Sequence, residues 1–115
     1  MIQLSSDTPI LLATQPVDFR KGIDGFVALC QSVLQKQAQN GHYFVFINRS
    51  RTMVRILSYD GNGYWLATKR LSKGRFQGWP SQKQTASQQS LLAIELRALL
   101  TGETMAPVTL KSNKN

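Results

Sequence analysis

The residues of this 115-residue chain whose types and spacing suggest chemistry are cations, and half of them lie close together. Seven of its fourteen Lys and Arg residues fall between Arg49 and Arg75, where Asp60 is the single acid. Guanidinium and ammonium groups clustered in this way bind phosphate oxygens through charge and hydrogen bonds. We therefore predict a phosphate-binding surface in this segment, formed by Arg49, Arg51, Arg55, Lys69, Arg70, Lys73 and Arg75. The competing interpretation is a solvated strand face that only happens to be basic.

A second concentration of charge, in the segment VDFRKGIDGF, also has two interpretations. In the first, Asp18 caps the helix that follows, and acids near the N-terminus of that helix are favoured by its dipole. In the second, Arg20 and Lys21 come at the end of an apolar strand and join the phosphate-binding surface.

Two aromatic residues, Phe76 and Trp79, lie in a polar segment beside the cation cluster. Rings placed on a basic loop can stack on nucleobases or insert into a groove of DNA. The alternative is that both are core residues, brought back over a sheet by the segment that carries them.

Residues for catalysis are scarce. Metal-dependent chemistry on phosphodiesters needs several carboxylates around divalent ions, and the chain has six acids, of which Asp60 is explained by its turn sequence. The single His42 and single Cys30 offer neither zinc-ligand spacing nor a nucleophile with its base, and Cys30 lies in the apolar stretch ALCQSVL of a buried structural residue. The sequence therefore predicts a protein that is not an enzyme and has no metal or cofactor.

The net charge of +8 indicates a polyanionic partner, with nucleic acid as the first candidate and a membrane surface as the second. No apolar run approaches the roughly 18 to 20 residues of a membrane-spanning helix. The N-terminal segment has no positive region before its apolar run, so it does not resemble a signal peptide. We expect a cytoplasmic protein that binds DNA and no membrane.

Several elements must position these residues. Apolar residues recur at helical spacing from Ile23 to about Gln37 and again from Ser90 to Leu100, with Gly102 as the C-terminal cap. Residues 72–90, rich in Gly, Ser and Gln, are expected to form a long solvated loop. The expected strands are ILLAT at 10–14, YFVFIN at 43–48, MVRILSY at 53–59 and YWLATKRL at 64–71.

These elements predict one α+β domain over residues 1–102, with a small, mainly antiparallel sheet of about four strands and two principal helices, followed by a flexible tail over 103–115. The strand YFVFI is apolar on both faces, which is typical of a central strand covered on both sides. DGNG predicts a tight hairpin. A meander of the last three strands places Arg49 and Arg51 at the same end of the sheet as Lys69 and Arg70.

Beyond these local signals, four motifs in order resemble a known family. They are DFRKGIDGF at 18–26, GHYFVFINRSR at 41–51, RILSYDGNGYWL at 55–66, and KRLSKGRF at 69–76 followed by Trp79 and Pro80. Together they resemble the TnpB-type accessory protein encoded by the second open reading frame of bacterial insertion sequences of the sixty-six type. The resemblance runs from about Leu11 to Gly102.

The resemblance implies a non-catalytic role in transposition beside a separate transposase that carries the acidic active site. Two hypotheses follow. In the first, the protein binds DNA directly through its basic surface and contacts phosphates without reading sequence. In the second, the protein is an interaction module whose basic face docks the transposase of the same element, and it meets DNA only through that complex.

Overall fold

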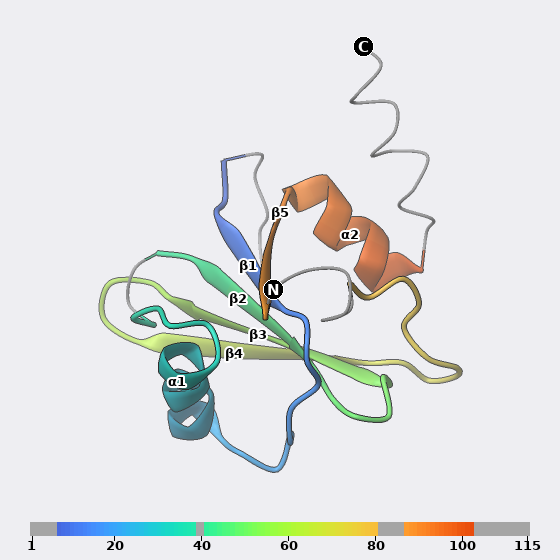
Figure 1. Ribbon diagram of the computed structural model, residues 1–115, viewed down its shortest axis with the longest axis horizontal. Helices are drawn as coiled ribbons and strands as arrows, with labels where there is room; N and C mark the ends of the chain where they lie inside the picture. The colour runs from blue at the N-terminus through green and yellow to red at the C-terminus, as the bar shows by residue number, and fades with distance from the viewer. Residues whose placement is uncertain (1–6, 39–40, 81–86, 103–115) are drawn as a thin grey trace.

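The computed structural model describes residues 7–38, 41–80 and 87–102, which form a five-stranded sheet with one helix on each face (Figure 1). The sequence predicted about four strands, and the additional one is β5. The helices are α1 (Ile23–Ser32) and α2 (Ala93–Thr101), and the strands are β1 (Ile10–Ala13), β2 (Tyr43–Ile47), β3 (Met53–Tyr59), β4 (Tyr64–Arg70) and β5 (Gln88–Leu91).

The order of the strands across the sheet is β4-β3-β2-β1-β5. β1 and β2 are parallel and are joined by the crossover that contains α1, whereas the pairs β2–β3, β3–β4 and β1–β5 are antiparallel. The predicted α+β class with a mainly antiparallel sheet and two helices is therefore confirmed. The meander of β2, β3 and β4 is also confirmed, and its hairpin closes where the Asp60 N–H donates to the Gly63 carbonyl at 3.0 Å.

β2 lies at the centre of the sheet and is buried on both faces, as its apolar sequence predicted. Phe44 and Phe46 pack with the α1 side of the core, whereas Val45 and Ile47 pack with the α2 side. Side chains alternate between the faces of a strand, so a continuous apolar strand needs a cover on each side. The two helices provide these covers, and Figure 1 shows them on opposite sides of the sheet.

Helix α1 ends earlier than its apolar periodicity indicated. We expected it to continue to about Gln37, but it ends at Ser32 because Gln35 adopts a left-handed conformation with φ 56°. The Lys36 N–H then donates to the Cys30 carbonyl at 3.0 Å and closes the helix end. Cys30 is buried, and this burial raises the pKa of its thiol to about 12, which agrees with the predicted structural cysteine.

Two expectations for the C-terminal part of the domain are wrong. The expected loop over residues 72–90 ends in strand β5, and α2 begins later than the expected Ser90. Residues Gln88–Leu91 pair with β1 along its free edge, although their side chains are mostly polar. The strand forms because β1 offers an unpaired row of backbone groups, which local propensity does not report. Helix α2 therefore begins at Ala93, where the Glu95 carboxylate accepts the Leu92 N–H at 2.9 Å, and Gly102 ends it with φ 85° as predicted.

The segment between β4 and β5 contributes two rings to the core from its described residues 71–80. Phe76 is 4% exposed and Trp79 is 8% exposed, and both pack in the α2 side of the core. The Trp79 indole Nε1 donates to the Ala13 carbonyl of β1 at 3.0 Å. The prediction of a solvated loop is therefore wrong for Phe76 and Trp79, which are core residues as the alternative interpretation held, whereas residues 72–75 and 77–78 are exposed.

We predict that Trp79→Phe lowers the free energy of unfolding by about 2 kcal/mol, because it leaves a buried carbonyl without its donor and creates a small void. Trp65→Phe is the matched control, since the Trp65 side chain lies on the surface and its loss should cost less than about 0.5 kcal/mol. Urea unfolding followed by far-ultraviolet circular dichroism measures both. Equal losses in the two variants would contradict the structural role of Trp79.

Candidate nucleic-acid interface

Three segments meet at one end of the sheet, which we call the basic end. The loop after β1 arrives where the Val17 N–H donates to the Ile47 carbonyl at 3.0 Å. The chain after β4 returns beside the β2–β3 turn, with the Leu71 N–H donating to the Thr52 carbonyl at 3.0 Å. The predicted convergence of the β2–β3 turn with the end of β4 is therefore confirmed.

The basic end carries most of the cations that the sequence singled out. Arg51 and Arg55 are half-buried, and the other cations in this region are exposed, which leaves charge on the surface where three segments converge. Two open depressions lie between the loop after β1 and the β2–β3 turn. Among the residues that line one or both of them are Asp18, Arg20, Lys21 and Arg49.

The β2–β3 turn is held from inside by Asn48. Its side-chain oxygen accepts the N–H groups of Thr52 and Met53 at 2.9 and 3.0 Å, and its amide nitrogen donates to the hydroxyls of Ser50 and Thr52. Since Asn48 is buried and these bonds fix the turn, the turn is a rigid platform for the arginine side chains that it carries.

Arg51 occupies a left-handed backbone conformation with φ 64°, which is uncommon for a residue other than glycine. Its carbonyl accepts the Phe76 N–H at 2.8 Å, so this conformation ties the chain after β4 to the turn. Arg51 thus has a structural role through its backbone, whatever its guanidinium binds.

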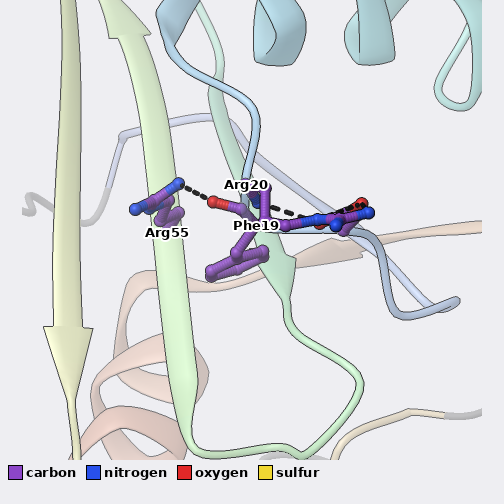
Figure 2. A network of polar contacts seen from close by, with 4 residues as sticks. Phe19, Arg20 and Arg55 are labelled. Atoms are coloured by element: carbon purple, nitrogen blue, oxygen red, sulfur yellow. Dashed lines mark hydrogen bonds and ion pairs between the residues drawn. The ribbon is translucent and has the colours of Figure 1, made fainter.

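Arg55 is engaged inside the protein. Its guanidinium donates to the carbonyls of Phe19 and Lys21 at 2.7 and 3.1 Å and to the Thr68 hydroxyl at 2.9 Å. It also lies over the rings of Phe19 and Phe26, at 5.0 and 5.5 Å from their centroids. Figure 2 shows Arg55 of β3 pointing to Phe19 of the loop. Arg55 therefore fastens the loop after β1 onto β3, and its guanidinium is engaged by these contacts.

Lys69 is also engaged. It pairs with Val54 and therefore lies on the α2 side of the sheet, where its Nζ donates to the Leu100 carbonyl at 2.6 Å. Carbonyls in the last turn of a helix have no partner within the helix and favour a cation. Lys69 thus stabilises the C-terminal end of α2, while its neighbour Arg70 lies on the opposite face of an edge strand.

The first interpretation of the VDFRKG segment, in which Asp18 caps α1, is wrong. The N-cap of α1 is Gly22, which has no side chain. The Asp18 carboxylate accepts the Arg20 N–H at 2.9 Å and pairs with the Arg20 guanidinium at 2.8 Å. The side-chain hydrogen bond from Arg20 holds the pKa of Asp18 well below its usual range. Asp18 therefore stays ionised, and Arg20 joins the basic end with its charge already paired.

The rings expected to stack on bases are not available for it, because Phe76 and Trp79 are buried. The exposed ring of the described chain is Trp65, which is 62% exposed on the edge strand β4. Its Nε1 donates to the Asp60 carboxylate at 2.8 Å, and this bond lowers the pKa of Asp60. Trp65 is not among the site residues predicted from the sequence, although the sequence places it in an expected strand five residues after the acid of a turn.

Within the described residues, no group of three or more His, Cys, Asp or Glu side chains is placed to hold a metal ion. The helices in that part of the chain are too short or too polar to cross a membrane.

The mixed sheet, the helix on each face and the exposed basic end define a small α+β protein with a cluster of cations at one end of the sheet. The chain belongs to the family described as IS66 Orf2 like protein, which matches residues 8–109. It is therefore an accessory protein of insertion sequences, as the four motifs predicted. No solved structure matches this chain.

Two curated relatives come from Sinorhizobium fredii (strain NBRC 101917 / NGR234). The uncharacterized protein y4jC is 43% identical over 76 residues, which cover 66% of this chain and 65% of the relative. The uncharacterized protein y4hO is 33% identical over 102 residues, which cover 89% of this chain and 86% of the relative.

We predict that Arg55→Gln lowers the free energy of unfolding by about 2 kcal/mol, because it leaves carbonyls of the loop after β1 without their charged donor. Arg70→Gln is the matched control: it removes the same charge from an exposed position of β4 and should cost less than about 0.5 kcal/mol. Denaturant unfolding measures both. If the two variants were equally stable, Arg55 would not hold the loop.

Proposed function

We propose that the protein binds DNA directly through its basic end and acts in transposition without catalysing a reaction. The observation that carries the proposal is the convergence of three segments, each of which presents cations at the same end of the sheet. The exposed cations of this surface whose side chains make no described ion pair or hydrogen bond are Lys21, Arg49, Arg70, Lys73 and Arg75.

The chemistry of these five residues is suited to a phosphate backbone. Arg49 stands on the turn fixed by Asn48, and Arg70 stands on a strand paired with β3, so their backbones are already ordered before a ligand binds. Pre-ordered cations lose less freedom on binding than cations on a flexible chain. In the described part of the chain, no helix lies at this end in a position to read bases, since α1 and α2 cover the two faces of the sheet. We therefore propose contact with phosphates and no strong preference for sequence.

Binding of this kind has a characteristic salt dependence. If the five cations neutralise about five phosphates, log affinity should fall with log salt at a slope near −4.5. Fluorescence anisotropy with labelled duplexes, one bearing the terminal repeat of the element and one a shuffled sequence, measures the slope and the preference. A flat salt response would overturn the proposal, and a strong preference for the repeat would overturn its sequence-independent form.

Single variants locate the surface. Arg49→Gln and Arg75→Gln should each reduce the size of the slope by about 0.9, because each removes one phosphate contact. Lys36→Gln is the control with the same charge change, since Lys36 follows the C-terminal end of α1, where the crossover has returned to the end of the sheet opposite the basic end. An equal effect of Lys36→Gln would mean that net charge, and not the basic end, attracts DNA.

A second candidate function, docking of the transposase of the same element, is favoured by Trp65. Exposed tryptophans are enriched among the residues that dominate protein interfaces, and the bond to Asp60 holds this indole in one orientation. Trp65 lies at the β3–β4 hairpin, and the basic end lies at the other end of the same two strands. A protein partner and DNA can therefore occupy separate surfaces.

We predict that Trp65→Ala weakens co-purification with the transposase from nuclease-treated extracts at least tenfold and leaves the affinity for DNA unchanged. The control is Leu92→Ala, which removes an exposed apolar side chain from the N-terminal end of α2. Retention of the complex by Trp65→Ala together with its loss in Arg75→Gln would show that the basic end docks the partner and that Trp65 does not.

A further inference from the structure

The loop after β1 places an acid inside the basic end. The backbone of this loop is fixed from β3, since the Arg55 guanidinium donates to the carbonyls of Phe19 and Lys21. The Val17 bridge to Asn48 fixes the loop from β2 as well. Asp18 is therefore held between these attachments, and its position is set by the fold.

The contacts between Asp18 and Arg20 resemble those that an arginine makes with a phosphate. The Arg20 Nε lies 3.1 Å from both carboxylate oxygens, and its NH2 nitrogen lies 2.8 Å from one of them. The Arg20 backbone N–H adds a further bond at 2.9 Å. Arginine binds carboxylate and phosphate with the same fork of donors, so one anion excludes the other from this edge. Figure 2 shows the Arg20 side chain turned along this contact.

This ion pair has little to do with stability. The Arg20 side chain is 91% exposed, and exposed ion pairs contribute little to the free energy of folding. The pair does determine how much charge the surface offers to a ligand. A carboxylate two residues away in the same chain is always near the guanidinium, whereas a phosphate must arrive from solution. The depressed pKa of Asp18 keeps this competitor ionised in neutral solution.

We infer that Asp18 is a built-in competitor of DNA phosphate that withholds Arg20 from the basic end. The inference rests on the proposed function and deepens it by defining which part of the surface DNA uses. The footprint lies over Lys21, the β2–β3 turn, the end of β4 and the chain after it, and Arg20 contributes no phosphate contact while Asp18 is present. The fold thereby limits the non-specific affinity for DNA of a protein whose net charge is +8.

The test compares Asp18→Asn with Asp24→Asn, which makes the same charge change at an exposed position in the first turn of α1. Asparagine keeps an oxygen that can accept the Arg20 N–H, so the loop retains its shape. In duplex anisotropy at 0.1 M salt, Asp18→Asn should bind about eightfold more tightly than the unchanged protein and with a slope steeper by about 0.9, which is the effect of one added phosphate contact. Asp24→Asn should change the affinity by less than about twofold.

Arg20→Gln in the Asp18→Asn background completes the test. It should remove the whole gain, because the guanidinium that Asp18→Asn sets free is then absent. Equal gains from Asp18→Asn and Asp24→Asn, or a gain that survives Arg20→Gln, would overturn the inference.

A heparin column separates this outcome from failure of the proposed function, because heparin is a polyanion that requires only clustered cations. Asp18→Asn should elute at higher salt than Asp24→Asn even if no duplex is bound. Co-elution of the two variants on heparin would overturn the inference independently of DNA.

Discussion

The architecture depends on the burial of β2 on both of its faces. The phenylalanines at 44 and 46 need an apolar cover on one side, and Val45 and Ile47 need one on the other. Helix α1, in the crossover between the parallel strands β1 and β2, covers the side of the phenylalanines. The other side is met by α2, which reaches its place only because β5 first extends the sheet beyond β1. Phe76 and Trp79 complete that side, so two rings of an otherwise exposed polar segment become part of the core.

The basic end follows from this layered arrangement. Helices cover the faces of the sheet, so polar side chains gather where strands turn and loops meet. Cations in such a place do not all have the same role. Arg55 and Lys69 satisfy backbone carbonyls within the protein, Arg20 is paired with Asp18, and Arg49 extends from a turn that is rigid through Asn48. The cations that cluster in the sequence therefore fall into two groups: some stabilise the fold or are paired with an acid, and the others are exposed and can bind a ligand.

The two ends of the β3–β4 hairpin differ in chemistry in a way that suits two partners. Arg70 ends β4 at the basic end, while Trp65 and Asp60 stand near the hairpin turn, linked by one hydrogen bond. The proposed contacts with DNA and with a second protein need surfaces that do not overlap. The length of one hairpin provides this separation without a second domain.

Local pattern in the chain was enough for the central strand, the hairpin at Asp60 and the helix cores, because periodicity and turn residues act over a few positions. The family followed from the resemblance that the four motifs carry. Local pattern did not show that Gln88–Leu91 is a strand, since only the open edge of β1 makes it one. Nor did it show which cations are free. The bond from Arg55 to Phe19 joins residues 36 positions apart, so the availability of each charge depends on contacts that exist only after the chain has folded.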